Sequence, residues 1–308
     1  MLHAPLLGIP VFPEFKALEL SDRESIEAFT AQFPPYSDFN FTSMWCWDTQ
    51  GEMRVSQLFG NLVLRFTDYM DSHPFYSFLG NSEIVKTTEM LLDYSSEQGL
   101  VSELKLIPSV VVKETQSPTL LYLTDWDNFD YILSVDAIKD YKGSHLMNKR
   151  NHANHFRKRY EFQSVAFNLK NDQDVTSIMT LCTEWMKAKM EKDGSEHDAE
   201  LVAMERLFQL PLSSKNFVAL GITLADKTIA FIISEIINNE YSLIHFQKAD
   251  TTHKGVSEVL MQTLAHEMGN RGLSYMNYEQ DLGILGLREG KKGYAPSSYL
   301  EKYRVSVQ

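Results

Sequence analysis

The chain has 308 residues, of which 44% are apolar and 23% are charged, and it carries a formal net charge of −12 at pH 7. This composition predicts a globular protein with one large or two ordinary domains, and the acidic balance argues against broad non-specific binding of nucleic acid. Two cysteines, Cys46 and Cys182, are too few for a disulfide framework, no secretory signal opens the sequence, and no apolar run is long enough to cross a bilayer. We therefore expect a cytoplasmic protein with reduced, buried thiols.

The first half of the chain alternates short apolar runs with helical patterns. Ser21 and Glu24 form a capping-box pair at the start of one helix, and Pro34 stops that helix. The dipeptide Gly60-Asn61 is typical of a hairpin turn between two strands. The predicted elements are a strand at 16–20, helices that begin near residues 21 and 37, strands at 53–59, 62–67 and 75–79, a helix at 82–98, and a strand at 104–107.

The second half repeats this order of elements. Its predicted elements are a strand at 161–169, helices at 172–192 and 196–210, strands at 217–224, 228–237 and 241–248, a helix from residue 256, and a strand at 273–278. Each half therefore predicts a strand, two helices, a three-stranded meander, a helix and a final strand. This order indicates a mixed α/β fold that occurs twice in the chain.

The loop between the last meander strand and the following helix contains one glycine, Gly255. A strand that leads into a helix through such a loop directs free backbone N–H groups at one place, where the helix dipole favours a phosphate. We expect the strands at 241–248 and 273–278 to diverge, with Gly255 closest to the phosphate of an acyl donor. The alternative is an ordinary strand–helix–strand unit without a ligand. The predicted donor-binding residues are Lys248, Asp250, His253, Lys254, Gly255, Val256 and Ser257.

Residues 141–160 form a basic segment without a single acidic residue. The segment predicts either a helix that binds a polyanion, such as tRNA, coenzyme A or an anionic head group, or a solvated linker between the two halves. Its histidines have no cysteine or carboxylate set beside them, so we expect no metal site. Together with basic positions near the C-terminus, the predicted phosphate- or polyanion-binding residues are Lys149, Arg150, Asn151, His152, Arg157, Arg288, Lys291 and Lys292.

Three residues near the C-terminus are candidates for acid–base chemistry: Glu279, Asp281 and Tyr294. Acyl transfer to an amine or hydroxyl needs a base for the attacking group and an acid for the leaving group. A carboxylate at the end of a strand could be the base, and a tyrosine hydroxyl could be the acid. The alternative for Glu279 and Asp281 is a structural role in capping, with Asp281 as the cap of the next short helix.

Two segments resemble a known family. The first is Asn148-Lys149-Arg150-Asn151-His152, and the second runs from Asn277-Tyr278-Glu279-Gln280-Asp281 through Gly286-Leu287-Arg288 to Lys291-Lys292-Gly293-Tyr294. Together with Lys248-Ala249-Asp250, they resemble a bacterial family of tandem GNAT proteins, which is similar to the C-terminal catalytic domain of phosphatidylglycerol lysyltransferases. The resemblance implies two GNAT-like acyltransferase domains, at 1–140 and 161–308, joined by a basic linker helix at 141–160.

The resemblance also implies a reaction. We expect an acyltransferase that uses aminoacyl-tRNA or acyl-coenzyme A as the donor, with no covalently bound cofactor. The acceptor would be an amine or hydroxyl of a small molecule, a peptide or a lipid head group. Since no nucleophilic triad is visible, direct transfer is favoured over a covalent enzyme intermediate. The alternative is a non-catalytic binding module that keeps the fold.

Overall fold

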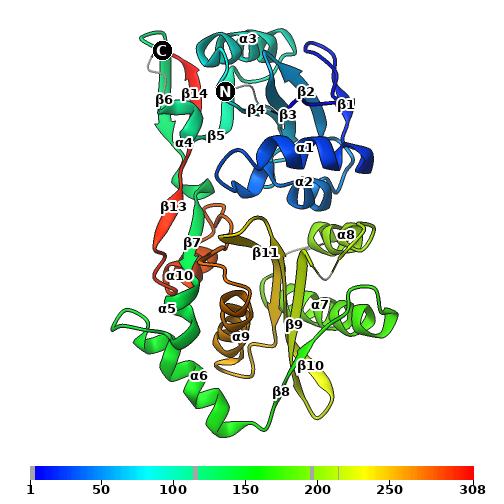
Figure 1. Ribbon diagram of the computed structural model, residues 1–308, viewed down its shortest axis with the longest axis vertical. Coiled ribbons are helices and arrows are strands. Elements are labelled where there is room, and N and C mark those ends of the chain that lie inside the picture. Colours follow the sequence, from blue (N-terminus) through cyan, green and yellow to red (C-terminus); the bar gives the residue numbers. More distant parts are fainter. Residues whose placement is uncertain (1–3, 114–116, 195–197, 214) are drawn as a thin grey trace. The chain divides into compact units, whose positions relative to one another are not determined.

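The chain is divided into two compact units (Figure 1). The computed structural model describes residues 4–113, 117–194, 198–213 and 215–308. Unit 1 contains the chain up to Asp130 together with Gln280–Ile284 and Leu300–Gln308, and unit 2 contains Tyr131–Glu279 and Leu285–Tyr299. Over the described residues each unit has one seven-stranded sheet with both parallel and antiparallel neighbours. The prediction of two α/β domains with mixed sheets is confirmed.

The sheet of unit 1 has the order β1-β2-β3-β4-β5-β14-β6. Its strands are β1 (Lys16–Ala17), β2 (Arg54–Leu58), β3 (Asn61–Thr67), β4 (Pro74–Leu79), β5 (Glu103–Pro108), β14 (Lys302–Val307) and β6 (Leu120–Thr124). The helices of the unit are α1 (Arg23–Thr30), α2 (Phe41–Trp47), α3 (Ile84–Glu97) and the single turn α4 (Ser109–Val112).

The meander of unit 1 forms because its turn and its apolar pattern agree. Phe59 and Gly60 both have positive φ angles, 52° and 81°, which is the geometry of a two-residue hairpin turn between β2 and β3. The turn therefore lies one residue earlier than the predicted Gly60-Asn61, because Asn61 is already paired with Leu58. Leu91 and Leu92 of α3 are fully buried in one apolar core with residues of β3, β4 and β5. The helix therefore covers one face of the sheet.

The sheet of unit 2 has the order β13-β7-β12-β11-β10-β9-β8. Its strands are β13 (Ser298–Leu300), β7 (Asp130–Ser134), β12 (Tyr275–Asn277), β11 (Tyr241–Ala249), β10 (Lys227–Ile236), β9 (Phe217–Leu224) and β8 (Gln163–Ala166). Its helices are α5 (Val135–Asp140), α6 (Met147–Arg159), α7 (Asp172–Asp193), α8 (Asp198–Leu207), α9 (Val256–Asn270) and α10 (Leu285–Lys292).

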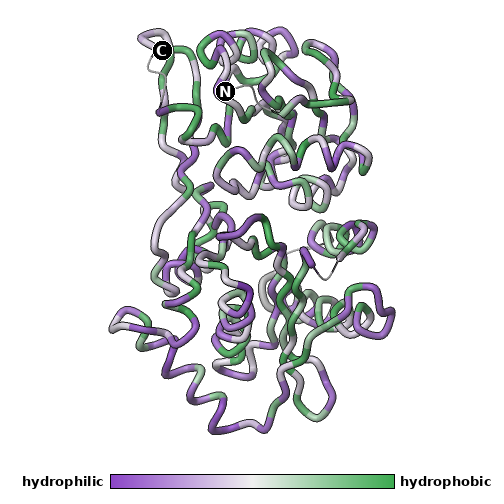
Figure 2. The backbone as a smooth tube through the Cα atoms, in the orientation of Figure 1, coloured by the Kyte–Doolittle hydropathy of each residue, from purple (hydrophilic) through white to green (hydrophobic). Residues whose placement is uncertain are grey.

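Helix α9 is the centre of the core of unit 2. Val256, Val259, Leu260 and Leu264 are at most 1% exposed and belong to one apolar cluster with residues of β9, β10, α5 and α6. Figure 2 shows the contrast between the apolar strands of this unit and the hydrophilic chain of α6. Truncating one of these leucines to alanine would cost about 2–5 kcal/mol by the usual scale for buried aliphatic residues.

The structure corrects the predicted assignment of strands to sheets. A domain at 161–308 would keep its strands in one sheet, but β14 pairs with β5 and β6 of unit 1, and β7, which precedes that range, pairs with β12 of unit 2. The bounds of the two compact units accordingly differ from the predicted ranges 1–140 and 161–308. The capping box also lies earlier than predicted, between Glu19 and Asp22.

Candidate functional site

Strand β12 is much shorter than its neighbour β11. They pair in parallel from Tyr241 opposite Tyr275 to Leu243 opposite Asn277, where β12 ends, whereas β11 continues to Ala249. The second half of β11 therefore has no partner residues from β12. All three residues of β12 are paired with β11, so the divergence of the two strands stays a prediction.

A β-bulge interrupts β11 close to the point where β12 ends. On the other side of the strand, Phe246 is paired with Ile233 of β10, but the next register pair joins Ile244 to Ser234. His245 is therefore the extra residue on the bulged strand, without a register partner on β10. Bulges change the direction of a side chain, and they are over-represented next to active sites.

The imidazole of His245 lies between two carboxylates. Its Nε2 is 3.1 Å from Oε2 of Glu235 on β10, and its Nδ1 is 3.8 Å from Oε1 of Glu279, which follows β12. The exposed fractions of the side chains are 1% for His245, 5% for Glu235 and 18% for Glu279. We call these three residues the His245 cluster. Glu279 is its most accessible member, so it is the one that can meet a substrate.

The backbone at Glu279 has an unusual conformation. Its φ angle is +55°, in the left-handed region that non-glycine residues rarely occupy. The N–H of Glu279 donates to Oδ1 of the fully buried Asn277 at 2.8 Å, and its carbonyl accepts from the N–H of Tyr131 at 3.2 Å. Such conformations are often found where the surrounding structure must hold a functional side chain in place.

The other predicted carboxylate, Asp281, has a different environment. It is fully buried, and its Oδ1 accepts the N–H of Gly283 at 2.9 Å while its carbonyl accepts the N–H of Ile284 at 3.0 Å. These bonds stabilise the turn before α10. They support a structural role for Asp281, although the residue stabilises the turn that ends directly before α10 and does not cap the first residue of the helix.

Tyr294 lies in the core of unit 2 with an exposed fraction of 3%. Burial, reinforced by the neighbouring Tyr141, raises the pKa of its hydroxyl well above the ordinary value, so the hydroxyl stays protonated. Its ring packs against Tyr278, with 5.8 Å between ring centroids, and carries the ammonium of Lys149 at 4.0 Å. A protonated hydroxyl suits the predicted acid, but its burial limits direct contact with a leaving group.

The chain itself fills the space next to β11 where β12 ends. The hydroxyl of Tyr278 donates to Oε1 of Gln247 at 2.7 Å. Nζ of Lys291 on α10 donates to the carbonyl of Tyr278 and lies 4.7 Å from the centroid of its ring. Of the predicted anion-binding residues on α10, Lys291 is thus engaged within the chain, Arg288 is half-buried and Lys292 is exposed.

Gly255 does not face an open slot, so this part of the donor-site prediction is wrong. Its φ angle is +96°, and a Cβ atom built there would lie 2.1 Å from the carbonyl oxygen of His152 and 3.0 Å from Cβ of Phe156. The glycine therefore permits close packing of α6 on the start of α9. The N–H of Val256 also has a partner, the carbonyl of His253 at 3.1 Å.

The other residues predicted to bind a donor mostly contact each other or nearby helices. Lys248 is 9% exposed, lies 2.5 Å from a carboxylate oxygen of Glu200 and stacks on Trp185 at 3.8 Å. Asp250 accepts the N–H and the hydroxyl of Thr252, and it lies 3.2 Å from His253. Ser257 is half-buried and Lys254 is exposed at the surface of this loop. Whether these residues bind a donor stays a prediction.

Helix α6 has a face that packs on α9 and a face that is exposed. On the packed face, Nζ of Lys149 is 3.2 Å from Oε1 of Glu258, Arg157 donates to Gln262, and Arg150 donates to the carbonyl of Tyr141. His152 lies 3.6 Å from Glu258 but is 41% exposed. The exposed polar residues of the helix are Asn148, Asn151, Asn154, His155, Arg157, Lys158 and Arg159. Two predicted polyanion contacts, Lys149 and Arg150, therefore serve internal packing.

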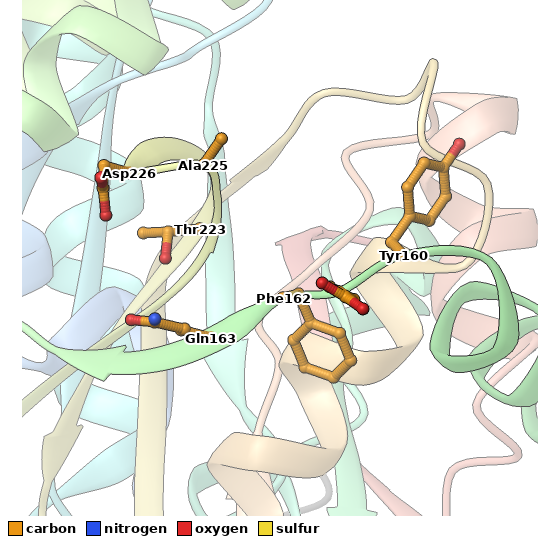
Figure 3. Close-up of a pocket in the computed structure, with 7 residues that line it drawn as sticks. Tyr160, Phe162, Gln163, Thr223, Ala225 and Asp226 are labelled. Carbon is orange, nitrogen blue, oxygen red and sulfur yellow. The ribbon is translucent and has the colours of Figure 1, made fainter.

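A cavity of about 470 Å³ lies at the end of α6 (Figure 3). In this view the side chain of Phe162 lies between Tyr160 on one side and Gln163, Thr223 and Asp226 on the other. Its complete lining is Tyr160, Glu161, Phe162, Gln163, Thr223, Ala225 and Asp226. None of the predicted site residues belongs to this lining.

Two members of the His245 cluster were not predicted. Glu235 interrupts the apolar run from Ile229 to Ile237, and His245 lies within the apolar strand at 241–248. A charged residue in each of two adjacent buried strands is the signal that could have found them, because buried charges are usually paired. The described residues contain no set of three His, Cys, Asp or Glu side chains arranged to hold a metal. They also contain no helix with the length and apolarity needed to cross a membrane.

Comparison with known proteins identifies the relatives of the chain. Residues 30–306 match the family model for the C-terminal part of phosphatidylglycerol lysyltransferase. A conserved protein of unknown function from Bacteroides thetaiotaomicron has a similar crystal structure, with a TM-score of 0.79, 23% identity and coverage of 96% of this chain and 99% of that chain. The structure of L-PGS from Bacillus licheniformis gives a TM-score of 0.57 at 14% identity, over 97% of this chain and 93% of that chain.

A curated relative matches over a shorter region. An uncharacterized protein of Mycoplasmoides gallisepticum is 24% identical over 179 residues, which are 58% of this chain and 56% of the relative. The match thus spans little more than half the length of that relative. The two solved structures share less than 25% identity with the chain, so they support the fold and not a particular substrate.

Proposed function

Since the chain belongs to the family of phosphatidylglycerol lysyltransferase C-terminal domains, we propose that it is an acyltransferase that moves an aminoacyl group from aminoacyl-tRNA to an amine or hydroxyl acceptor. The observation that carries this proposal is the position of Glu279. Its carboxylate lies at the end of β12, beside the bulge of β11, and has more access to solvent than its partner His245. This is a suitable place for a general base.

The proposed reaction needs one proton acceptor. The acceptor amine or hydroxyl attacks the carbonyl carbon of the aminoacyl ester, and its proton passes to the carboxylate of Glu279. The ester bond to the ribose oxygen then breaks, and that oxygen leaves with a proton. A positioned base of this kind typically contributes about 10²–10⁴-fold to the rate.

The surroundings of Gly255 favour aminoacyl-tRNA over acyl-coenzyme A. The pyrophosphate of coenzyme A would need the N-terminus of α9, but the backbone of α6 occupies the space beside Gly255. The first turn of α9 also contains the carboxylate of Glu258, which repels a second anion and is already paired with Lys149. A tRNA donor can instead be bound through its backbone by the exposed basic side chains of α6.

Membership of the family indicates the chemical class of the acceptor but not its identity. Because the matched family is described by lysine transfer to phosphatidylglycerol, a lipid hydroxyl is the first acceptor to test, followed by small amines and peptides. The alternative is a binding module without catalysis. The lack of space beside Gly255 favours a non-catalytic binding module only if the donor has to bind at the N-terminus of α9.

Single-turnover transfer tests the proposal. Purified protein is mixed with a pool of radiolabelled aminoacyl-tRNAs and with phosphatidylglycerol vesicles, small amines or peptides, and the acylated product is measured. We expect product with the wild-type chain and a rate lower by roughly 10²-fold or more for Glu279→Gln, with unchanged tRNA affinity. Glu205→Gln, at an exposed position of α8, is the control and should keep the wild-type rate. Equal rates for Glu279→Gln and wild type would remove Glu279 as the base.

A further inference from the structure

The His245 cluster contains more than the general base needs. A carboxylate that only accepted a proton could stand alone at the end of β12, yet a nearly fully buried histidine and a second carboxylate lie behind it. Placing two carboxylates and an imidazole in a strand core is costly unless they interact with each other.

We propose that His245 and Glu235 are positioning residues that orient the Glu279 carboxylate and stabilise it while it carries the proton, an assignment that rests on the proposed acyl transfer. The ring of His245 links the two carboxylates, with 3.1 Å between Glu235 and Nε2 of His245 and 3.8 Å between Nδ1 of His245 and Glu279. The two outer groups are acids, and the ring between them is the only one of the three that can carry a positive charge.

Glu235 selects the tautomer of the ring. A carboxylate accepts hydrogen bonds and cannot donate one when ionised, so the nitrogen that faces Glu235 at 3.1 Å carries a proton. Nδ1 is then the nitrogen directed at Glu279. It can accept from Glu279 when that residue is protonated, or it can donate to the ionised carboxylate when the ring carries both protons.

The bulge and the backbone of Glu279 bring the two partners to the same place. The bulge adds His245 as an extra residue of β11, and it does so at the point where β12 ends. The left-handed φ angle of Glu279 and the bond from its N–H to Asn277 determine where its side chain leaves the strand. A residue with an ordinary φ angle would direct its side chain elsewhere, so the strain at Glu279 has a function in this arrangement.

Each catalytic cycle returns the cluster to its starting protonation state. The acceptor gives its proton to Glu279 as its nitrogen or oxygen bonds to the acyl carbon. The 3.8 Å separation from Nδ1 is long for a hydrogen bond, and shortening it by about 1 Å would let His245 share this proton. The proton returns to the ribose oxygen of the tRNA when the ester bond breaks. The three residues therefore end each cycle in their starting protonation state.

Kinetics on three variants test the assignment. Glu235→Gln and His245→Gln should each lower kcat by at least about 10-fold, which is part of the contribution of a positioned base, and leave KM for aminoacyl-tRNA within about 2-fold. Glu279→Gln should cost more, and the double variant Glu235→Gln/Glu279→Gln should be no slower than Glu279→Gln alone. The control is His266→Gln, at an exposed position of α9. Additive losses in the double variant would overturn the proposal.

Nitrogen NMR of the histidine rings tests the same contact without any substrate. The chain has nine histidines, and His245→Gln identifies the signal of His245. We expect a slowly exchanging proton on Nε2 that is weakened or lost in Glu235→Gln, and a shift of the Nδ1 resonance in Glu279→Gln. A spectrum of His245 that is the same in wild type and in both variants would overturn the proposal, because the ring would then contact neither carboxylate.

The two measurements separate this inference from the proposed function. If no donor and acceptor pair gives a product but the NMR signals respond as expected, the acyl transfer fails while the contact is real, and the positioning role is rejected with the reaction. If transfer is observed and depends on Glu279 but not on His245 or Glu235, the function stands and this inference fails. If Glu235→Gln does not fold, Glu279→Gln alters the most exposed member of the cluster and still reports on the Nδ1 contact.

Discussion

Replacing Gly255 by alanine should destabilise unit 2 by an amount that can be worked out from two terms. The φ angle of +96° costs a non-glycine residue about 1–2 kcal/mol. A Cβ atom would also lie 2.1 Å from the carbonyl oxygen of His152, so α6 would have to move by more than 1 Å, and overpacking of that kind costs about 1–3 kcal/mol. The sum is roughly 2–5 kcal/mol, a large share of the usual stability of a domain.

The matched control is Gly272→Ala. Gly272 also has a positive φ angle, +83°, but a Cβ atom there would meet nothing within 4 Å. This variant has only the cost of the positive φ angle. The difference in unfolding free energy between the two variants therefore measures the contact with α6. Urea unfolding followed by circular dichroism measures both. Gly255→Ala should be less stable than Gly272→Ala by about 1–3 kcal/mol. Equal stabilities would refute the packing of α6 on Gly255 and would restore the possibility of a phosphate there.

Two further predictions concern charge. Lys302→Met should destabilise unit 1 by about 3–5 kcal/mol in thermal or urea unfolding, because the fully buried ammonium is paired with Asp38 and Asp130, and its removal leaves two buried carboxylates. Burial, with the charge of Asp130, raises the pKa of Asp38, so this carboxyl is protonated more readily than an ordinary aspartate. An acid with a raised pKa favours the folded state below its ordinary pKa and loses that contribution as the pH rises through the folded value. The loss caused by Lys302→Met should therefore shrink on acidification, and a pH-independent loss would contradict the pairing. The double variant Lys158→Glu/Arg159→Glu on the exposed end of α6 should weaken tRNA binding and lower its salt dependence, whereas Lys187→Glu on α7 should change neither. Unchanged affinity and salt slope in the double variant would leave α6 as a solvated linker.

The meanders were predictable because local signals agree with the final structure. The strand predicted at 217–224 is β9 residue for residue, and those predicted at 62–67 and 241–248 differ from β3 and β11 by one residue at one end. Turn residues and apolar runs define these hairpins without help from distant parts of the chain. The exchange of β7 and β14 between the two sheets was not predictable, since the partner of a strand depends on contacts between residues far apart in the sequence.

The candidate site was partly predictable for the same reason. Glu279 was identified because the end of a strand is visible in the sequence, but His245 is brought to it by a bulge, and alternation of apolar residues does not reveal a bulge. Gly255 shows the converse. A glycine before a helix correctly indicated a close approach of another group, but the absence of a side chain cannot say whether a phosphate or the backbone of α6 comes close.

The contact between Gly255 and α6 also links the fold to the choice of donor. The start of α9 already has a carboxylate in its first turn, Glu258, with Lys149 of α6 beside it at 3.2 Å. A coenzyme A pyrophosphate could bind there only after α6 moved away and the buried Glu258 lost its cation, and each step costs free energy that the ligand would have to supply. A tRNA bound on the exposed face of α6 requires neither step, because the contacts of α6 with α9 can stay as they are. Donor binding that leaves the packing of α6 intact is therefore the expectation, and protection of the α6 amides from hydrogen exchange should persist or increase when aminoacyl-tRNA is added.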